Sequence, residues 1–227
     1  MNKNNLRHIA LILDGNKRWA KKNGNTNING YKKGFENIKF IVDHGLKLNL
    51  KELTLFTLSS ENFNRPSINI IYQIINENFS KLLDDLAIKR NIKIKIFGSR
   101  SNLPKKIINI FEKIENKTAN NNSLNLNLAF NYGFKEEIKD VLENFKKNTN
   151  INLDNHNEIR KLFFLGNYSD PDILIRTGGY QRLSNFIMYN LTYTELFFTK
   201  TLWPDFSTDE FDKIIMQYSQ INRKYGL

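Results

Sequence analysis

Short runs of apolar and β-branched residues alternate along the chain with longer segments whose apolar residues recur at helical spacing. The strand-like runs cover residues 8–13, 53–58, 92–97, 124–130, 173–175 and 195–198. Strands that alternate with helices form a mainly parallel sheet whose faces the helices cover. The pattern therefore predicts an α/β fold with a mainly parallel central sheet.

One helical segment, residues 68–86, has a wide apolar face. It follows Pro66, a suitable opening residue, and its apolar positions at helical spacing are Ile68, Ile71, Tyr72, Ile75, Phe79, Leu82 and Leu86, widened by Ile70, Ile74 and Leu83. Such a face can pack against both the sheet and a neighbouring helix. Ordinary packing is the simpler explanation, and one wall of a long apolar cavity is the alternative.

Loops and chain length define the domain organisation. Polar loops are expected at residues 117–123 and 147–157, and the chain shows no internal repeat or interdomain linker. A cap at Ser207 predicts a last helix that ends near Gly226. With 227 residues, of which 40% are hydrophobic and 25% charged, residues 1–227 are expected to form a single domain.

The charge and the residue types present narrow the chemistry. A net charge of +11 favours anionic partners. The alternative is that runs such as Asn120-Asn121-Asn122 reflect a biased composition, in which case many of the charged side chains are ordinary solvated surface residues. The chain has no Cys, which excludes disulfides and thiolate zinc sites. Its three histidines lie apart and lack zinc-site spacing, and Walker, Gly-x-Gly-x-x-Gly and Gly-x-Ser-x-Gly motifs do not occur.

Neither an export signal nor a membrane span is expected. The apolar run after residues 1–5 is too short for a signal peptide, and no apolar stretch approaches the roughly 20 residues that span a bilayer. The absence of Cys fits a reducing compartment. We therefore expect a cytoplasmic protein whose contact with membranes, where it occurs, is peripheral.

The first polar motif follows the first expected strand and consists of Asp14, Gly15, Asn16, Lys17, Arg18 and Trp19. Ligands bind at this edge of open α/β sheets. A simple turn explains the Asp-Gly and Gly-Asn pairs. The alternative is a diphosphate site in which Asp14 holds Mg²⁺, backbone N–H groups approach at Gly15, and Lys17 and Arg18 supply positive charge.

Two further motifs follow later strands. After the second strand come Ser59, Ser60, Glu61, Asn62, Phe63, Asn64, Arg65 and Pro66, either a capped polar loop or a second side of the same crevice. After residues 173–175 come Arg176, Thr177, Gly178, Gly179, Arg182, Leu183, Ser184 and Asn185, either a glycine turn or a phosphate cradle. Glu195 places one acid at the edge of an aromatic strand, where a ligand role would offset the cost of burial.

In this order and spacing the motifs resemble those of the cis-prenyltransferases, most closely the bacterial undecaprenyl diphosphate synthases, over about residues 8–226. Asn131-Tyr132-Gly133 and Leu202-Trp203-Pro204-Asp205-Phe206 also match. The resemblance implies a parallel sheet ringed by helices, a hydrophobic tunnel between sheet and helices, and a homodimer. It also implies Mg²⁺-dependent condensation of isopentenyl diphosphate onto an allylic primer, with farnesyl diphosphate expected as primer and undecaprenyl diphosphate, a cell-wall carrier lipid, as product.

The resemblance assigns roles to individual residues. Asp14 and Glu195 would bind Mg²⁺, and Asn62 would assist removal of a proton from isopentenyl diphosphate, although a neutral amide is a poor base. Leu124 matches the tunnel floor, where a smaller side chain should lengthen the product. Arg176, Arg182 and Ser184 would hold isopentenyl diphosphate. The other expected substrate contacts are Gly15, Asn16, Lys17, Arg18, Trp19, Asn27, Tyr31, Ser59, Ser60, Glu61, Phe63, Arg65 and Leu183.

The chain departs from the family pattern at several of these positions. Asn27 and Tyr31 replace an Arg and a His, which removes one guanidinium clamp from the allylic site. Lys17 stands where Gly is frequent, Phe63 replaces a Trp, Lys200 occupies a position that is acidic in some members, and Tyr180-Gln181 replaces a Glu-His pair. These changes bear on metal and substrate affinity rather than on the reaction type.

Two other functions compete with this interpretation. A non-catalytic family subunit typically loses the catalytic acid and the phosphate cradle, whereas Asp14, Arg176 and Arg182 are present. A nucleic-acid-binding module would fit the charge, but the lysines are spread along the chain and no nucleic-acid motif occurs, so no nucleic-acid partner is expected. A product of another chain length is the alternative within the family. Because Asp14 lies in a loop, replacing it is expected to leave the thermal midpoint unchanged or slightly raised.

Overall fold

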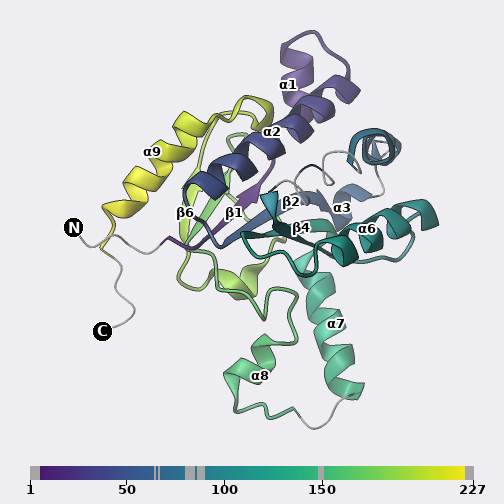
Figure 1. Cartoon of the computed structure of the whole chain (residues 1–227), viewed down its shortest axis with the longest axis vertical. Helices are drawn as coiled ribbons and strands as arrows, with labels where there is room; N and C mark the ends of the chain where they lie inside the picture. Colours follow the sequence, from purple (N-terminus) through teal and green to yellow (C-terminus); the bar gives the residue numbers. More distant parts are fainter. Residues whose placement is uncertain are drawn as a thin grey trace.

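A six-stranded, all-parallel sheet forms the centre of the molecule (Figure 1). The computed structural model describes residues 6–63, 65, 67–79, 85, 90–147 and 151–222. The strand order is β3-β4-β2-β1-β5-β6, and the strands are β1 His8–Ile12, β2 Glu52–Ser59, β3 Ile92–Phe97, β4 Leu124–Tyr132, β5 Ile173–Arg176 and β6 Glu195–Phe198. The α/β fold and the expected strands are confirmed, with some ends shifted by one or two residues.

Helices occupy the intervals between strands. The α-helices are α1 Asn16–Lys22, α2 Asn27–Lys47, α3 Ser60–Phe63, α4 Ile68–Ile74, α6 Lys105–Lys117, α7 Phe134–Lys147, α8 His156–Arg160 and α9 Thr208–Ser219. A π-helical segment, Ile75–Phe79, continues α4, and the 3₁₀ turns are Met188–Leu191 and Trp203–Asp205. In the described part of the chain, no helix combines the length and apolar character that a bilayer crossing requires.

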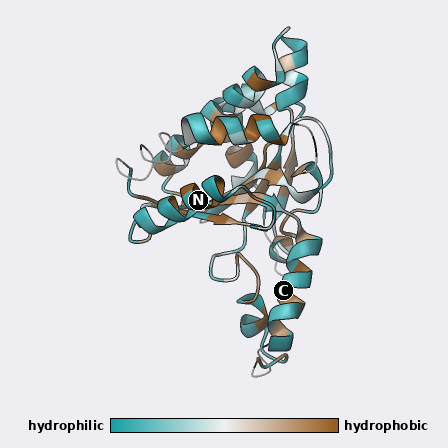
Figure 2. Cartoon of the chain, turned by 90° about the vertical axis from the view of Figure 1, so that its right-hand side faces the viewer, coloured by the Kyte–Doolittle hydropathy of each residue, from teal (hydrophilic) through white to brown (hydrophobic). Residues whose placement is uncertain are grey.

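Alternate residues of each strand enter different cores, as the two-residue period of a strand requires. Ile9 and Leu11 of β1 belong to a core with buried residues of α2, α6 and α9, whereas Ala10 and Ile12 pack with residues of α7 and the chain segments that follow it. Figure 2 shows the mainly hydrophobic strands at the centre, between helices that carry both polar and apolar residues. Burial on both faces explains why the strands are nearly continuous apolar runs.

The order of the strands brings the three polar motifs together. β1 lies between β2 and β5, and both pairings are parallel. The loops that follow these three strands therefore leave the same edge of the sheet. Ligands of open α/β sheets bind at this edge, in the crevice between loops that diverge to either side of one strand, which here is β1. Convergence of the motifs at one crevice is thus a consequence of the topology.

The predicted helices at residues 68–86 and after Ser207 differ in part from the helices of the structure. The segment 68–86 is not one regular α-helix, because α-helical hydrogen bonding gives way to π-helical geometry at Ile75. Leu82, Leu83 and Leu86 lie outside the described residues, as do Asn64 and Pro66 of the second motif. The last helix has its expected cap, since Ser207 Oγ accepts from the Glu210 N–H at 3.2 Å. It ends at Ser219, and Gly226 lies outside the described residues.

A buried histidine ties β1 to its surroundings. The His8 ring has no exposed surface, and its Nδ1 lies 2.6 Å from the Ser169 carbonyl oxygen while Nε2 lies 2.7 Å from Thr54 Oγ1. A carbonyl only accepts, so Nδ1 carries the proton and Nε2 accepts from the Thr54 hydroxyl. Burial lowers the pKa of His8 to about 4. The ring is therefore neutral at pH 7, and its 3.2 Å contact with Glu52 is not an ion pair.

The His8 environment predicts a loss of stability in acid. The pKa of His8 is about 4 in the folded state against 6.5 for a free side chain, so stability that is complete above pH 6.5 declines as the pH falls through this window. Burial raises the pKa of Glu52, so proton uptake by Glu52 increases stability as the pH falls. Comparing wild type with His8→Gln separates the His8 contribution from that of Glu52, because both proteins contain Glu52. Urea unfolding should show the stability advantage of wild type over the variant shrinking by about 2 kcal/mol between pH 8 and pH 5. Parallel pH curves would contradict a neutral buried His8.

Candidate functional site

Two polar pockets and one apolar cavity adjoin one another at the carboxyl edge of the sheet. The Lys17 pocket, of about 770 Å³ including its open mouth, is lined by Asp14, Gly15, Lys17, Arg18 and Tyr31 among others. The Arg182 pocket, of about 1260 Å³ on the same measure, is lined among others by Asp14, Arg176, Tyr180, Arg182 and Ser184. Asp14, Asn62 and Arg65 line both polar pockets, so the two form one divided crevice.

Asp14 stands between the two pockets and is held by a guanidinium from each side. Its Oδ1 accepts from Arg18 Nη2 at 2.9 Å, and its Oδ2 accepts from Arg176 Nη2 at 2.9 Å. The Arg176 side chain is only 4% exposed, whereas that of Asp14 is 29% exposed. The carboxylate thus faces the crevice while it neutralises a buried cation.

Arg176 connects this carboxylate to the third motif. Its Nη1 donates to the Arg182 carbonyl oxygen and to Ser184 Oγ, the latter at 2.7 Å. Ser184 adopts a positive φ of 50°, an uncommon backbone conformation for a residue other than Gly. These bonds hold the chain in a tight loop around the guanidinium. The phosphate cradle expected at this motif therefore has a fixed backbone.

Gly15 and Gly178 both have a positive φ, and Gly178 allows the first and third motifs to approach each other. Gly15 has a φ of 125°, and a β-carbon on Gly178, whose φ is 87°, would lie 2.5 Å from Arg18 Nη2. Arg18 Nη1 donates to the Gly178 carbonyl oxygen at 2.5 Å. Any larger residue at Gly178 would displace this guanidinium. Glycine is therefore needed at this position for contact between the motifs, not only for a turn.

Thr177, to which the sequence assigns no role, fastens the same loops. It is fully buried, and its Oγ1 lies 3.0 Å from the Asp14 backbone nitrogen and 2.8 Å from the Asp14 carbonyl oxygen. The hydroxyl accepts from the first and donates to the second. The sequence shows a Thr directly after Arg176, the last residue of β5, but sequence spacing does not show that its hydroxyl would contact the Asp14 backbone.

The second motif contributes the opposite wall of the crevice. Ser59, Glu61, Asn62 and Arg65 all line the Arg182 pocket, and Asn62 and Arg65 also face the Lys17 pocket. This side of the crevice adds a further cation, Arg65, and the amide of Asn62. The predicted convergence of the first and second motifs is confirmed for these residues.

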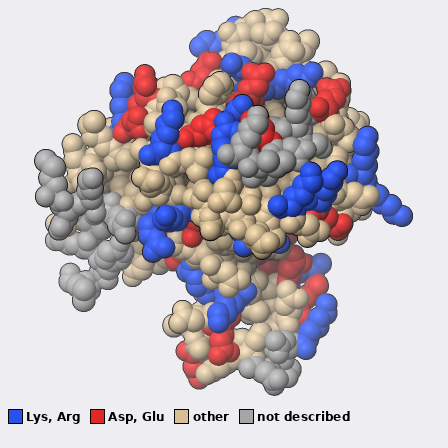
Figure 3. Space-filling model, in the orientation of Figure 1, with Lys and Arg blue, Asp and Glu red and all other residues tan. Residues whose placement is uncertain are grey.

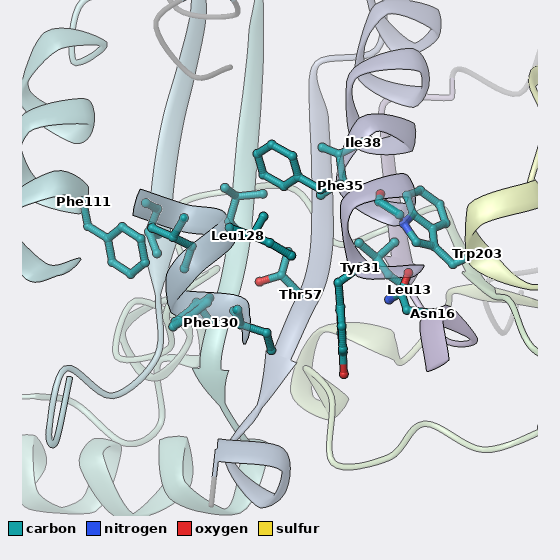
Figure 4. Close-up of a pocket in the computed structure, with 15 residues that line it drawn as sticks. Leu13, Asn16, Tyr31, Phe35, Ile38, Thr57, Phe111, Leu128, Phe130 and Trp203 are labelled. Carbon is teal, nitrogen blue, oxygen red and sulfur yellow. Dashed lines mark hydrogen bonds between the residues drawn. The ribbon is translucent and has the colours of Figure 1, made fainter. Parts of the chain in front are cut away.

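An apolar cavity of about 650 Å³, including its mouth, opens beside the Lys17 pocket (Figure 4). Leu13, Asn16 and Tyr31 line both spaces, so the two are continuous. Ile71, Ile74 and Ile75 come from α4 and its π-helical continuation, which makes this helix a wall of the cavity rather than only a packing element. The part of the lining that neither polar pocket shares includes Ile96, Phe111 and Leu128.

Tyr31 and Asn16 mark the boundary between apolar and polar space. In Figure 4 the Tyr31 phenol points away from Phe35 and Ile38, which lie on the apolar side. Burial raises the pKa of Tyr31, an effect that its hydrogen bond to Ser67 and the charge of Arg65 partly offset. The Asn16 side-chain oxygen is buried without a hydrogen-bond partner in the described structure. An unsatisfied oxygen at this junction is available to a ligand donor.

Several expected substrate contacts line none of these three spaces. The Trp19 indole donates to Asp205 Oδ1 at 2.6 Å and lines neither polar pocket nor the cavity. Asn27, exposed at the first residue of α2, is also absent from all three linings, as are Ser60, Phe63 and Leu183. Phe63 and Leu183 instead pack against the two apolar cores. For Trp19, Ser60 and Phe63 the reason is helix phase, because neighbouring residues of one short helix face different directions.

Glu195 and Leu124 line neither the two polar pockets nor the apolar cavity. Glu195 starts β6 opposite Ile173, whereas Arg176, the partner of Asp14, pairs with Phe198 at the other end of the strand. The described residues thus show no site that Glu195 shares with Asp14, and a metal role for Glu195 stays a prediction. Leu124 is the first residue of β4 and is absent from the cavity lining, to which Leu128 and Phe130 of the same strand contribute.

The crevice is lined by two carboxylates of the kind that Mg²⁺ binds, Asp14 and Glu61, and Glu61 Oε1 already accepts from Asn185 Nδ2 at 3.0 Å. Among the described residues no group of three or more His, Cys, Asp or Glu side chains gathers as a preformed metal cage. Mg²⁺ commonly uses one or two carboxylates together with substrate phosphate oxygens and water. Asp14, partly exposed and flanked by the guanidiniums of Arg18 and Arg176, fits that mode of binding.

Comparison with known proteins agrees with this geometry. The model of the family described as "Putative undecaprenyl diphosphate synthase" matches residues 12–226. The chain is 39% identical to an isoprenyl transferase of Aquifex pyrophilus, over 96% of this chain and 95% of the relative. It is 36% identical to an isoprenyl transferase of Fusobacterium nucleatum, over 100% of this chain and 98% of the relative.

Solved structures give the same result. Lavandulyl diphosphate synthase from Lavandula x intermedia, determined in complex with dimethylallyl diphosphate, superposes with a TM-score of 0.90 at 28% identity and covers 97% of this chain and 98% of its own. A probable undecaprenyl diphosphate synthase from Campylobacter jejuni superposes with a TM-score of 0.79 at 28% identity, covering 99% and 100%. The motifs, the crevice and these full-length matches lead to one conclusion: the chain belongs to the prenyltransferase family of isoprenyl transferases and undecaprenyl diphosphate synthases.

Proposed function

We propose that this prenyltransferase condenses isopentenyl diphosphate onto an allylic diphosphate primer, with farnesyl diphosphate as the primer and a long-chain polyprenyl diphosphate as the product. The observation that carries the proposal is the continuity of an apolar cavity with a crevice divided into two cationic pockets. A substrate with a diphosphate head and a hydrocarbon tail requires one cationic pocket joined to apolar space. A second diphosphate requires the second pocket.

The two substrates can be assigned to the two pockets by this geometry. The primer diphosphate would occupy the Lys17 pocket, because that pocket shares Leu13, Asn16 and Tyr31 with the apolar cavity. Isopentenyl diphosphate, with its short hydrocarbon part, would occupy the Arg182 pocket. The lavandulyl diphosphate synthase structure, which holds the allylic compound dimethylallyl diphosphate, supports an allylic substrate for this fold.

Bond formation would take place where the pockets meet. The C1–O bond of the primer breaks and the diphosphate leaves with the electron pair, C1 bonds to C4 of isopentenyl diphosphate, and C2 of the latter loses a proton. Arg18 and Lys17 would stabilise the charge that develops on the leaving diphosphate. Asn62 lines both pockets and would orient the reacting ends, since its neutral amide is a poor base.

We also propose that Mg²⁺ assists the reaction and that Asp14 is the residue of this crevice that would hold it. Bound there, the ion would supply positive charge to the diphosphate oxygens. Asp14 already carries two arginine contacts, so its carboxylate would be shared between these guanidiniums and the metal.

The assembly and the cellular setting are proposals on family grounds. A homodimer is typical of the family, and an undecaprenyl product would serve as a cell-wall carrier lipid, with peripheral membrane contact during product release. On the face shown in Figure 3, Lys and Arg are interspersed with Asp and Glu, which does not favour a nucleic-acid surface. Incubation with Mg²⁺, farnesyl diphosphate and labelled isopentenyl diphosphate, followed by chromatography of the products, tests the function. Lack of incorporation by folded protein would favour a non-catalytic subunit.

Replacing Asp14 should separate catalysis from stability. Asp14→Asn keeps an oxygen acceptor for Arg176 but loses the counter-charge, so it should lower kcat by roughly 10² to 10⁴ and should cost less unfolding free energy than Asp14→Ala. Asp14→Ala should be as inactive and should lose about 3 to 5 kcal/mol of unfolding free energy, because it removes both the counter-charge and the acceptor of the buried Arg176. This corrects the sequence-based expectation of an unchanged or raised thermal midpoint. Mg²⁺-dependent turnover and urea unfolding of both variants provide the check, and near-normal turnover by Asp14→Asn would exclude the role.

The pocket assignment predicts opposite effects for two cations. Lys17 lines only the Lys17 pocket of the two, and Arg182 only the Arg182 pocket. Arg182→Ala should raise KM chiefly for isopentenyl diphosphate, by roughly tenfold or more for a lost charged hydrogen bond, and Lys17→Ala should raise KM chiefly for the primer. Steady-state kinetics with each substrate varied in turn provides the test. A reversed pattern would exchange the two assignments.

Product length should depend on the part of the cavity farthest from the polar pockets. Phe111→Leu and Leu128→Ala each remove bulk from this lining and should shift products toward longer chains, with Leu128→Ala costing about 2 to 5 kcal/mol of stability. Leu124→Ala is the matched control, because Leu124 is equally buried on the same strand but lies outside the lining as described. Reverse-phase chromatography of the products measures the distribution. Lengthening by Leu124→Ala alone would restore that residue as the tunnel floor.

A further inference from the structure

The ring of Tyr180 lies among three arginines of the crevice. The guanidinium carbons lie 4.3 Å from the ring centroid for Arg182, 4.8 Å for Arg18 and 5.6 Å for Arg176. All three distances are within the range of cation–π attraction, which extends to about 6 Å. One neutral side chain thus contacts guanidiniums that belong to both polar pockets.

These guanidiniums need an organising group that does not cancel their charge. Asp14 contacts two of them, Arg18 and Arg176, while Arg182 has no carboxylate partner among the described residues. Three cations close together repel one another unless a counter-charge or an electron-rich ring lies between them. A second carboxylate would reduce the repulsion but would also remove positive charge that diphosphates require. An aromatic face reduces it without that loss.

The arginines differ in how strongly other contacts hold them. Arg176 is almost buried and binds Asp14, Ser184 and the Arg182 carbonyl oxygen. Within the described part of the chain, the Arg182 guanidinium makes one hydrogen bond, a long one of 3.4 Å to Ser184 Oγ, and of the three guanidiniums it lies closest to the ring. Arg182 therefore depends most on Tyr180 for its position.

We propose that Tyr180 is a positioning residue for both diphosphate sites, whose ring holds Arg18, Arg176 and Arg182 in place while leaving their positive charge available to the substrates. This inference rests on the proposed function. Tyr180 is 44% exposed, so its contribution to core packing is small and its removal should leave the fold intact. Binding energy is gained because the arginine side chains are ordered before the diphosphate arrives.

The test is the affinity for inorganic pyrophosphate, measured by titration calorimetry on the full chain with and without Mg²⁺. Tyr180→Leu should weaken binding roughly tenfold, since each side chain that must then be ordered on binding costs affinity. Tyr180→Phe, which keeps the ring and removes the hydroxyl, should bind like wild type. Tyr180→Glu should bind more weakly than wild type without Mg²⁺ and recover in part when the ion is present.

The KM values of the two substrates provide a second measurement, because loss of a merely structural side chain would not change one KM more than the other. Tyr180→Leu should raise KM for isopentenyl diphosphate more than KM for the primer, because the Arg182 guanidinium is the least anchored, and kcat should change less than either. Phe40→Leu, the same kind of exchange at an exposed aromatic of α2, is the control and should leave both constants unchanged.

The outcomes are distinguishable. Wild-type affinity in Tyr180→Leu, or equal weakening in Tyr180→Phe and Tyr180→Leu, overturns the role of the ring. If wild type itself fails to bind pyrophosphate and fails to incorporate isopentenyl diphosphate, the proposed function is overturned instead. Weak binding by Tyr180→Leu with rescue by Tyr180→Phe supports the inference.

Discussion

The crevice depends on one ion pair, formed by Asp14 and Arg176 across the carboxyl ends of β1 and β5. A guanidinium that is 4% exposed cannot remain without a counter-charge, because burying an unpaired cation costs several kcal/mol. The carboxylate that satisfies it is the acid of the first motif. The structural requirement of Arg176 therefore fixes the position of the group to which we assign the metal.

The same pair explains why the two pockets have a common wall. Arg176 extends the constraint to the third motif through Ser184 and the Arg182 carbonyl oxygen, and Asp14 extends it to α1 through Arg18. The Asp14–Arg176 pair thus anchors the segment that carries Arg18 in the Lys17 pocket and the segment that carries Arg182 in the Arg182 pocket. The division of the crevice follows from parallel strands whose loops must diverge on either side of β1.

The sequence was sufficient for the fold and for the presence of the site, but not for the direction of each side chain. Buried strands such as residues 92–97 are identifiable because burial on both faces requires nearly continuous apolar residues. Motif spacing predicts that Asp14 and Arg182 meet at one crevice, and the structure brings them together because strand ends converge. Spacing does not predict that Trp19 bonds Asp205 or that Leu124 lies outside the cavity lining, because helix phase and depth along a strand depend on packing that spacing does not encode. Tyr180 was noted only as a departure, since its three partners come from two different segments.

The boundary between the apolar cavity and the Lys17 pocket determines where a substrate's tail ends and its head begins. Leu13, directly after β1, lines the cavity as well as both polar pockets, and Asp14, the next residue, lines the polar pockets but not the cavity. A tail held in the cavity then fixes where its diphosphate lies, and cations ordered before binding need little rearrangement to meet it. A chain that grows by adding units at its head must push its tail into the cavity at each addition. The crevice can therefore keep the same geometry for every step, while the cavity alone responds to product length.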